Sequence, residues 1–139
     1  MSGFPTLQQT KTILEISLSK NTERRAVEFV MRYEKNQGRS PNDVGKKKVG
    51  YDIKSSSRLI EVKGQSAKKP DNIFLYNQTL NKLGDQILNY YIYLVYDMKN
   101  KPKLRILPPE KIFGNIEIDT TFLVRGRVFK DITDTDLSN

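Results

Sequence analysis

Hydrophobic spacing divides the chain into one helical segment followed by several short strands. The pattern predicts a helix over residues 23–37, with Asn21 or Thr22 as its N-cap and Gly38 as its stop signal. The preceding residues fit both an alternating strand and one face of a helix. We therefore assign residues 1–20 to an N-terminal extension without choosing between the two.

Alternation with a period of two predicts the strands. Residues 49–54 and 58–64 form a predicted hairpin around a serine turn, and residues 73–76 form a third short strand. A second helix is expected to begin near Asn77. The nearly continuous apolar run of residues 90–96 is typical of a central strand covered on both faces. Further strand candidates follow at 104–107, 116–118 and 122–124.

The order of these elements predicts the fold class. A helix, three strands, a helix and two strands indicate an α/β fold with a mixed sheet flanked by helices. A length of 139 residues suits a single domain with its own core. We place that core in residues 21–112 and expect a C-terminal extension with an acidic end over residues 113–139.

Composition narrows the chemistry available to the chain. It has no Cys and no His, which excludes disulfides, thiolate metal sites and the commonest general base. Any reaction must therefore use carboxylates, Lys, Tyr or hydroxyl groups. The sequence does not start with a basic region followed by an apolar stretch, and no apolar run is long enough to cross a bilayer. We expect a cytoplasmic protein with no membrane partner.

Positive charge is concentrated in the middle of the sequence. The chain carries net +8, and the window from Lys46 to Lys69 has eight basic residues against Asp52 and Glu61. Such a patch favours a polyanion, and we expect double-stranded or branched DNA as the partner. A Lys-rich surface that only keeps the protein solvated is the alternative. The expected nucleic-acid contacts are Lys46, Lys47, Lys48, Lys54, Arg58, Lys68 and Lys69.

Three short acidic-x-Lys motifs occur, and the context of one separates it from the others. Alternation along the strand puts Glu61, Lys63 and Gln65 on one face. Hairpin pairing can set Asp52 beside Glu61 on that same face. The motif that begins at Asp97 instead leads into a polar turn, where solvated charges are the ordinary expectation. Glu61-Val-Lys63 is therefore the candidate for chemistry.

Two neighbouring carboxylates favour a metal site. At about 4 Å they repel by roughly 4 kcal/mol at an effective dielectric near 20, and a divalent cation turns this repulsion into attraction. Oxygen ligands select a hard ion, so we expect Mg²⁺ or Mn²⁺ bound by Asp52, Glu61 and the backbone carbonyl of Val62. Lys63 would then lie next to the reacting phosphate. The alternative is a solvated cross-strand salt bridge, worth about 0 to 1 kcal/mol.

The first helix offers a further carboxylate to this group. Glu23 falls on the predicted packing face of the helix, near its start, where a charged side chain needs a partner. Glu34 lies near the same face, three turns along. We prefer Glu23 as the helix contribution to the site.

In combination, these features resemble the PD-(D/E)xK nuclease superfamily, whose core is helix, three strands, helix and strand. The resemblance covers about residues 22–112, and within the superfamily it is closest to the domain at the C-terminus of NO VEIN-like proteins. Mrr-like restriction domains and archaeal Holliday-junction-resolvase-like nucleases are similar at the same positions. The segments that resemble the NO VEIN-like domain are ERRAVEFVMRYEKNQGR, GYDIKS, RLIEVKG, IFLYNQ and YYIYLVYDMKNKPKLRILPP.

The resemblance implies a restriction-endonuclease-like fold and a metal-dependent active site. It assigns the catalytic positions to Glu23, Asp52, Glu61 and Lys63. The superfamily's Pro-Asp pair is Tyr51-Asp52 here, a variation that the NO VEIN-like group shares. Gln65 continues the same face and is either a further catalytic residue or a surface residue at a strand end.

These observations lead to a Mg²⁺-dependent DNA endonuclease of the restriction, repair or recombination type. One alternative is a nuclease fold kept as a non-catalytic nucleic-acid-binding module, and another is a structural protein that is merely basic. We also expect a homodimer, because cutting both strands of a duplex takes two sites. The candidate dimer interfaces are the N-terminal segment and the chain after Pro109.

Overall fold

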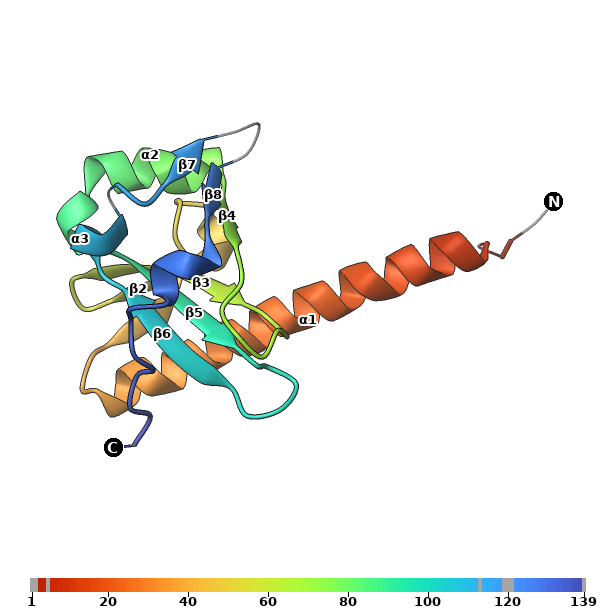
Figure 1. Cartoon of the computed structure of the whole chain (residues 1–139), viewed down its shortest axis with the longest axis horizontal. Helices are drawn as coiled ribbons and strands as arrows, with labels where there is room; N and C mark the ends of the chain where they lie inside the picture. The colour runs from red at the N-terminus through yellow and green to blue at the C-terminus, as the bar shows by residue number, and fades with distance from the viewer. Residues whose placement is uncertain (1–2, 5, 113, 119–121, 139) are drawn as a thin grey trace.

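The computed structural model describes residues 3–4, 6–112, 114–118 and 122–138, and it has a mixed α/β architecture built on two sheets (Figure 1). The main sheet has the strand order β1-β2-β3-β5-β6 and the second sheet the order β4-β8-β7. The main-sheet strands are β1 (Pro41–Asp43), β2 (Ile53–Ser55), β3 (Arg58–Gly64), β5 (Tyr90–Tyr96) and β6 (Lys103–Leu107). The second sheet consists of β4 (Ile73–Leu75), β7 (Glu117–Ile118) and β8 (Phe122–Val124). The helices are α1 (Leu7–Asn36), α2 (Asn77–Asp85) and α3 (Pro109–Ile112), with 3-10 turns η1 (Gly45–Lys47), η2 (Ile87–Asn89) and η3 (Gly126–Phe129).

The main sheet is mixed, as the sequence predicts. Strand β5 pairs in parallel with β3, where Glu61 lies beside Ile92, and antiparallel with β6, where Ile92 lies beside Leu107. The strands β1, β2 and β3 form an antiparallel meander. The prediction that residues 90–96 form a central strand is confirmed, because six of its seven residues are buried.

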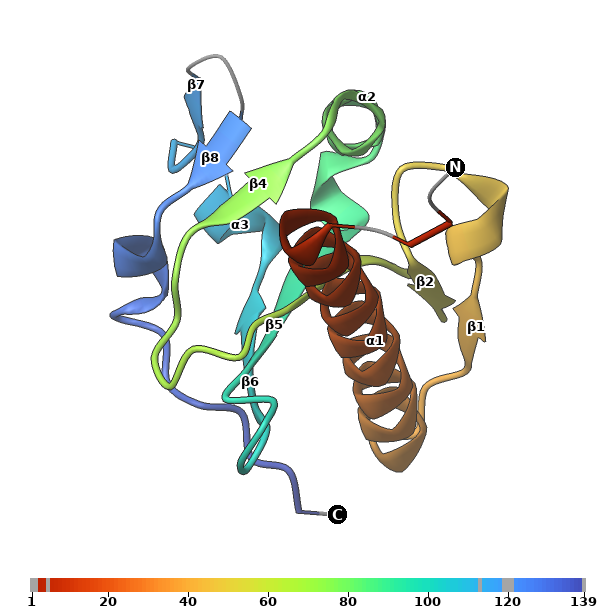
Figure 2. The same cartoon turned by 90° about the vertical axis from the view of Figure 1, so that its right-hand side faces the viewer.

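Two hydrophobic cores lie on the two faces of this sheet. One packs α1 through Ala26 and Val30 against Ile60 and neighbouring strands. The other packs Leu59 and the opposite face of the sheet against the second sheet, α3 and η3. Figure 2 shows α1 in front of the main sheet, with the second sheet and α2 above it. Side chains of β3 therefore alternate between the α1 layer and the layer that contains α2.

The first helix is far longer than the sequence predicts. It begins at Leu7, where Thr6 is the N-cap: Thr6 Oγ1 accepts from the Gln9 amide at 3.0 Å, and Gln9 Oε1 accepts from the Thr6 amide at 2.8 Å. The predicted start at Asn21 or Thr22 is therefore wrong. The predicted stop is confirmed, because the helix ends at Asn36 and Gly38 follows with φ +83°. The first half of α1 projects from the body as an arm (Figure 1).

The strand predictions hold in part. Strand β3 has the predicted bounds, but β2 covers only Ile53–Ser55, so Asp52 precedes β2 rather than lying inside it. Residues 39–48, which separate the predicted first helix from the predicted hairpin, contain β1 and η1. Strand β4, the third predicted strand, was expected in the main sheet. It pairs instead with β8 of the C-terminal segment and therefore belongs to the second sheet.

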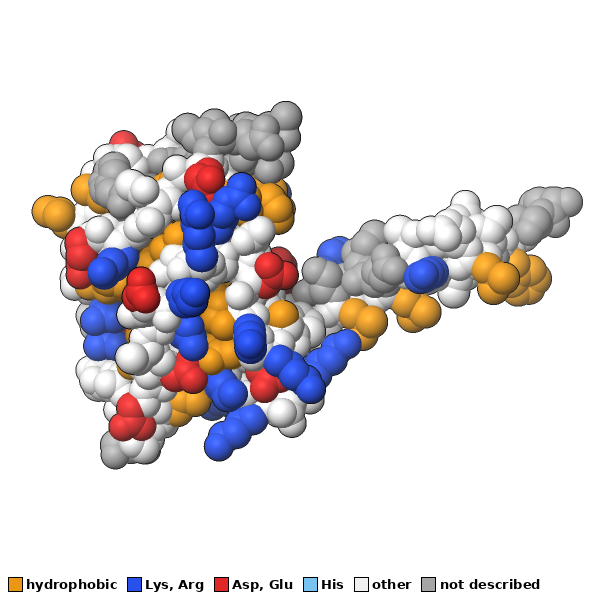
Figure 3. All heavy atoms as spheres, viewed as in Figure 1, with side chains coloured by type: hydrophobic (Ala, Val, Ile, Leu, Met, Phe, Trp, Pro, Cys, Tyr) orange, Lys and Arg blue, Asp and Glu red, His pale blue; other side chains and the backbone are white. Residues whose placement is uncertain are grey.

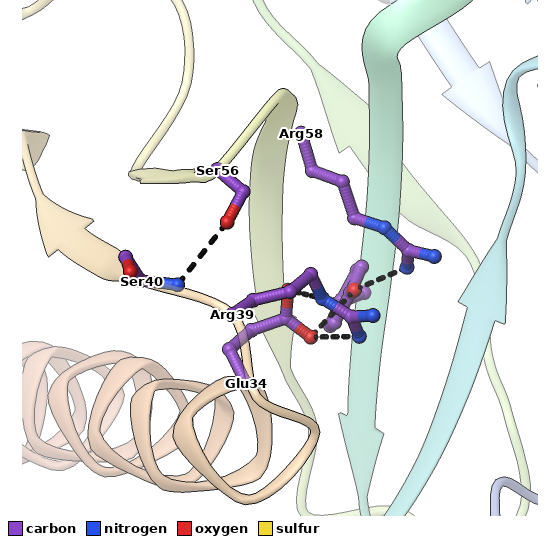
Figure 4. Close-up of polar contacts among 6 residues, drawn as sticks. Glu34, Arg39, Ser40, Ser56 and Arg58 are labelled. Carbon is purple, nitrogen blue, oxygen red and sulfur yellow. Dashed lines mark hydrogen bonds and ion pairs between the residues drawn. The ribbon is translucent and has the colours of Figure 1, made fainter.

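A buried ion-pair network fixes the end of α1 to the sheet. The carboxylate of Glu34 is fully buried and receives two hydrogen bonds of 2.6 Å from Arg39 and one of 2.9 Å from the Tyr93 hydroxyl. Arg58 donates to the same hydroxyl at 2.8 Å (Figure 4). Burial alone would raise the pKa of Glu34, but the Arg39 and Tyr93 hydrogen bonds hold that pKa below its ordinary value.

The C-terminal segment packs against the body rather than extending away from it. The Thr135 amide donates to the Leu104 carbonyl at 2.8 Å, and Asp134 accepts from Tyr96 at 2.6 Å and from Arg105 at 2.8 Å. Among the described residues, none of the helices combines the length and the apolar character that a bilayer crossing requires.

Candidate functional site

Asp52 and Glu61 meet where β2 begins. The register pairs Ile53 with Ile60, so the next pair outward is Asp52 opposite Glu61. Both the backbone and the side chain of Asp52 are hydrogen-bonded to β3: its amide donates to the Ile60 carbonyl at 2.9 Å, and its Oδ2 accepts from the Val62 amide at 2.8 Å. The sequence prediction that the hairpin sets the two carboxylates side by side is confirmed.

Glu61 is a buried carboxyl group in an environment that disfavours its charge. It is 7% exposed, and its Oε2 accepts from the Thr79 hydroxyl of α2 at 2.7 Å. Burial, followed by the hydrogen bond and the charge of Asp52, raises the pKa of Glu61 to about 9. Lys63 opposes this rise without cancelling it. Without a cation, the pair therefore retains a proton at neutral pH.

Lys63 lies two residues further along the same face of β3. Its Nζ is 5.3 Å from the centre of the Tyr76 ring, which is 69% exposed. Tyr76, Thr79, Asp52, Glu61 and Lys63 line a common pocket of about 180 Å³. The ammonium thus sits beside the carboxylate pair with an exposed aromatic ring next to it.

A larger cleft of about 910 Å³ opens from the carboxylate pair toward α1. Glu23 lines it from the helix, as the sequence predicts, together with Asp52, Glu61 and Lys63. Glu34, the alternative, belongs to the buried network with Arg39 instead. Among the described residues, no three carboxylates lie close enough together to hold one ion, so Glu23 lines the cleft without completing a three-carboxylate cage.

The predicted basic contacts are divided among several places. Lys46 of η1 lines the large cleft, and Lys48 lines the smaller pocket. Lys47, Lys54 and Lys68 are exposed outside both, and Lys69 lines a separate hollow. Arg58 is occupied: it donates to Tyr93 and stacks 4.3 Å from the centre of the Tyr91 ring.

Gln65 is not brought to the cleft. Its amide nitrogen donates to the carbonyl groups of Asp71 and Asn72 at 2.8 and 3.2 Å, and its Oε1 accepts from the Asp71 amide at 2.9 Å. The side chain therefore ties the loop after β3 to the end of that strand.

Several residues of the site carry no clear sequence signal. Thr79 is a single threonine on a short helix, and its burial against Glu61 depends on how α2 packs. Asp43 lines the cleft from β1, a strand too short to show alternation, and Glu28 lines it from α1. Tyr76 could have been found, because Ile73 and Leu75 alternate inward and leave the residues between and after them outside.

The donor set suits a small hard cation. Val62 directs its amide toward Asp52, and a residue in a strand points its amide and carbonyl the same way, so the Val62 carbonyl lies on the Asp52 side. Two carboxylates, one of them buried beside the other, and a backbone oxygen match the ligands that Mg²⁺ takes along with water. Asp52, Glu61 and Val62 thus fit the predicted metal.

A family model described as "Protein NO VEIN, C-terminal" matches residues 22–107, which is more than half of the chain. The chain belongs to this NO VEIN C-terminal family. The match contains Glu23, Asp52, Glu61 and Lys63, and it ends at the last residue of β6. The projecting arm of α1 and the strands β7 and β8 lie outside the NO VEIN C-terminal match. Neither a curated protein nor a solved structure matches the chain.

Proposed function

We propose that the protein is a Mg²⁺-dependent nuclease that hydrolyses phosphodiester bonds in DNA. The observation that carries this proposal is the Asp52–Glu61 pair, with a buried Glu61 whose neighbour is a second carboxylate and with Lys63 on the same face. A fold selected for stability alone would avoid this arrangement, because it costs free energy unless a cation or proton is bound. The order of elements and the resemblance to PD-(D/E)xK nucleases support the same proposal.

The residues of the chain would divide the work as follows. Asp52, Glu61 and the Val62 carbonyl hold Mg²⁺ or Mn²⁺, which when bound lowers the pKa of a coordinated water and neutralises phosphate charge. Lys63 offers three N–H donors to orient the attacking water and to stabilise the charge that develops on the phosphate. The water oxygen bonds to phosphorus and releases a proton to bulk water, the bond from phosphorus to the leaving sugar oxygen breaks, and that oxygen takes up a proton from bulk water.

Further residues prepare the site for this reaction. Thr79 fixes the rotamer of Glu61, and the Val62 amide fixes Asp52. Lys46, which lines the cleft, supplies a positive charge for the backbone of the substrate. Glu23 lines the same cleft and would bind a water of the metal shell.

The proposal is tested by Lys63→Ala. We expect loss of Mg²⁺-dependent cleavage by 100-fold or more, on the order of the contribution of one positioned charged group, with DNA binding retained. Lys35→Ala, which removes an exposed lysine in the last turn of α1, is the matched control and should cut at the wild-type rate. Undiminished cleavage by Lys63→Ala would remove Lys63 from the mechanism.

A non-catalytic nucleic-acid-binding module is the second candidate. It is favoured by the lack of a three-carboxylate group among the described residues. It predicts salt-dependent DNA binding without cleavage in Mg²⁺ or Mn²⁺. The same cleavage assay therefore separates the two functions.

We also propose a homodimer, held together by the projecting half of α1. Its described side chains include the exposed Leu7, Leu14 and Leu18, which lie on one helical face at i, i+7 and i+11. A lone helix of this length is marginal in water, so an apolar partner would stabilise it. Pairing two copies would supply two active sites for the two strands of a duplex.

A further inference from the structure

A second hollow, separate from the candidate active site, is lined by cations. It has a volume of about 410 Å³, and its charged lining residues are Lys69, Arg105, Arg127 and Lys130. They come from three segments far apart in the sequence, namely the loop after β3, strand β6 and the η3 region. No carboxylate lines this hollow among the described residues. The fold therefore gathers positive charge here.

The walls of the hollow are locked to one another. The Gly126 amide donates to Asn72 Oδ1 at 2.7 Å, and a Cβ at Gly126 would come within 2.7 Å of the Pro70 carbonyl oxygen, so only glycine allows this contact. Arg105 is held by Asp134 at 2.8 Å and by a backbone carbonyl of η3 at 2.7 Å. The cations thus stand on a rigid frame.

Neighbouring acids neutralise only part of this charge. Asp134 pairs with Arg105, whereas Glu117 comes no closer than 3.9 Å to Arg127. For Lys69 and Lys130, no side-chain hydrogen bond or ion pair to another described residue is present. Two ammonium groups and a guanidinium are therefore available to an anion.

The distribution of charge around the hollow indicates a long anion rather than a small one. Figure 3 shows Lys and Arg side chains in a band that runs from the region of η3 across this face to the base of the projecting half of α1. A band that extends beyond one pocket matches a chain of phosphates better than a single phosphate ion. Arginine and lysine together suit phosphodiester oxygens.

We propose that this hollow binds backbone phosphates of the nucleic-acid duplex, at a distance from the bond that is cut. The identity of the polymer rests on the proposed function. Gln65 gains a role from this proposal, because it anchors the loop that carries Lys69 to the end of β3. The same strand thus carries Glu61 and Lys63 and leads into the phosphate-binding loop.

The test compares two double variants of equal charge. Lys69→Ala with Lys130→Ala removes two cations from the hollow, and Lys35→Ala with Lys111→Ala removes two exposed cations elsewhere. Binding to a fluorescent duplex of about 20 base pairs is measured by anisotropy in EDTA over a range of salt concentrations, so no cleavage occurs. The hollow variant should lose affinity about tenfold at ~0.1 M salt and lower the salt slope by about 2, with little change in the control.

Two results of this comparison would overturn the proposal. Equal losses in both variants would show that only net charge matters, and an unchanged hollow variant would show that the duplex binds elsewhere. Because the assay contains no divalent cation, it is independent of catalysis. A protein that binds through the hollow but never cuts would contradict the proposed nuclease and leave the phosphate site standing.

Discussion

At the scale of single residues, the buried carboxyl group of Glu61 makes the stability of the fold depend on pH. Its folded-state pKa of about 9 lies above its ordinary value of 4.5, so the folded protein binds a proton that the unfolded chain releases. The stability contributed by that proton is complete below pH 4.5. It is lost as pH rises through 9.

Glu61→Gln therefore predicts a change in the pH dependence of stability. The amide keeps the shape of the acid and can still accept from Thr79, but it does not ionise. Between pH 6 and 8 in EDTA, the free energy of unfolding of the wild type should fall more steeply with pH than that of the variant, by up to about 1.4 kcal/mol per pH unit. Urea denaturation at several pH values measures this. Parallel curves for the two proteins would mean that Glu61 is ionised throughout.

At the scale of elements, the position of β3 depends on its close contact with α1. A Cβ at Gly64 would lie 2.9 Å from Ala26 Cβ and 3.1 Å from the Thr22 carbonyl oxygen, so the helix can approach only a glycine. This contact brings the Glu23 turn of α1 to the cleft that Glu61 and Lys63 line.

Gly64→Ala should separate the helix from the strand and destabilise the fold by about 1–3 kcal/mol, as overpacking does. Gly84→Ala is the matched control, since nothing lies within 4 Å of a Cβ there and the residue is inside α2. That control should be neutral or more stable by up to about 1 kcal/mol. Urea midpoints that move equally in the two variants would contradict the close-contact argument.

The elements also show which parts of the fold can be predicted from sequence. Alternation on β3 and hairpin pairing placed Asp52, Glu61 and Lys63 correctly, because both rules are local. The start of α1 was missed although Thr6 and Gln9 form a readable capping box, since the apolar pattern after them fits two structures. The pairing of β4 with β8 and the contact of Thr79 with Glu61 join distant segments, which no local pattern encodes.

At the scale of the whole molecule, the projecting half of α1 determines the proposed assembly. Its exposed leucines are surrounded by few charges, so two copies can pair without strong repulsion. The family match begins at residue 22 and therefore does not include this segment. The proposed dimer contact and the proposed catalytic residues therefore lie in different parts of the chain.

Leu14→Lys with Leu18→Lys should convert a dimer into a monomer at micromolar concentration, because four like charges then meet at the interface. Gln8→Lys with Thr12→Lys adds the same charge at the same spacing on polar positions and should leave the dimer intact. Sedimentation velocity distinguishes the two masses. A wild type that stays monomeric at every accessible concentration would contradict the proposed dimer.

The central claim is that the Asp52–Glu61 pair holds a divalent cation for phosphodiester cleavage. The most direct measurement is incubation of the wild type and Glu61→Ala with plasmid, linear, single-stranded and four-way-junction DNA in Mg²⁺, Mn²⁺ or EDTA. We expect the wild type to cut at least one of these substrates with either metal, and neither the wild type in EDTA nor the variant in metal to cut any. Intact DNA in every wild-type reaction, or equal cleavage by Glu61→Ala, would contradict the account.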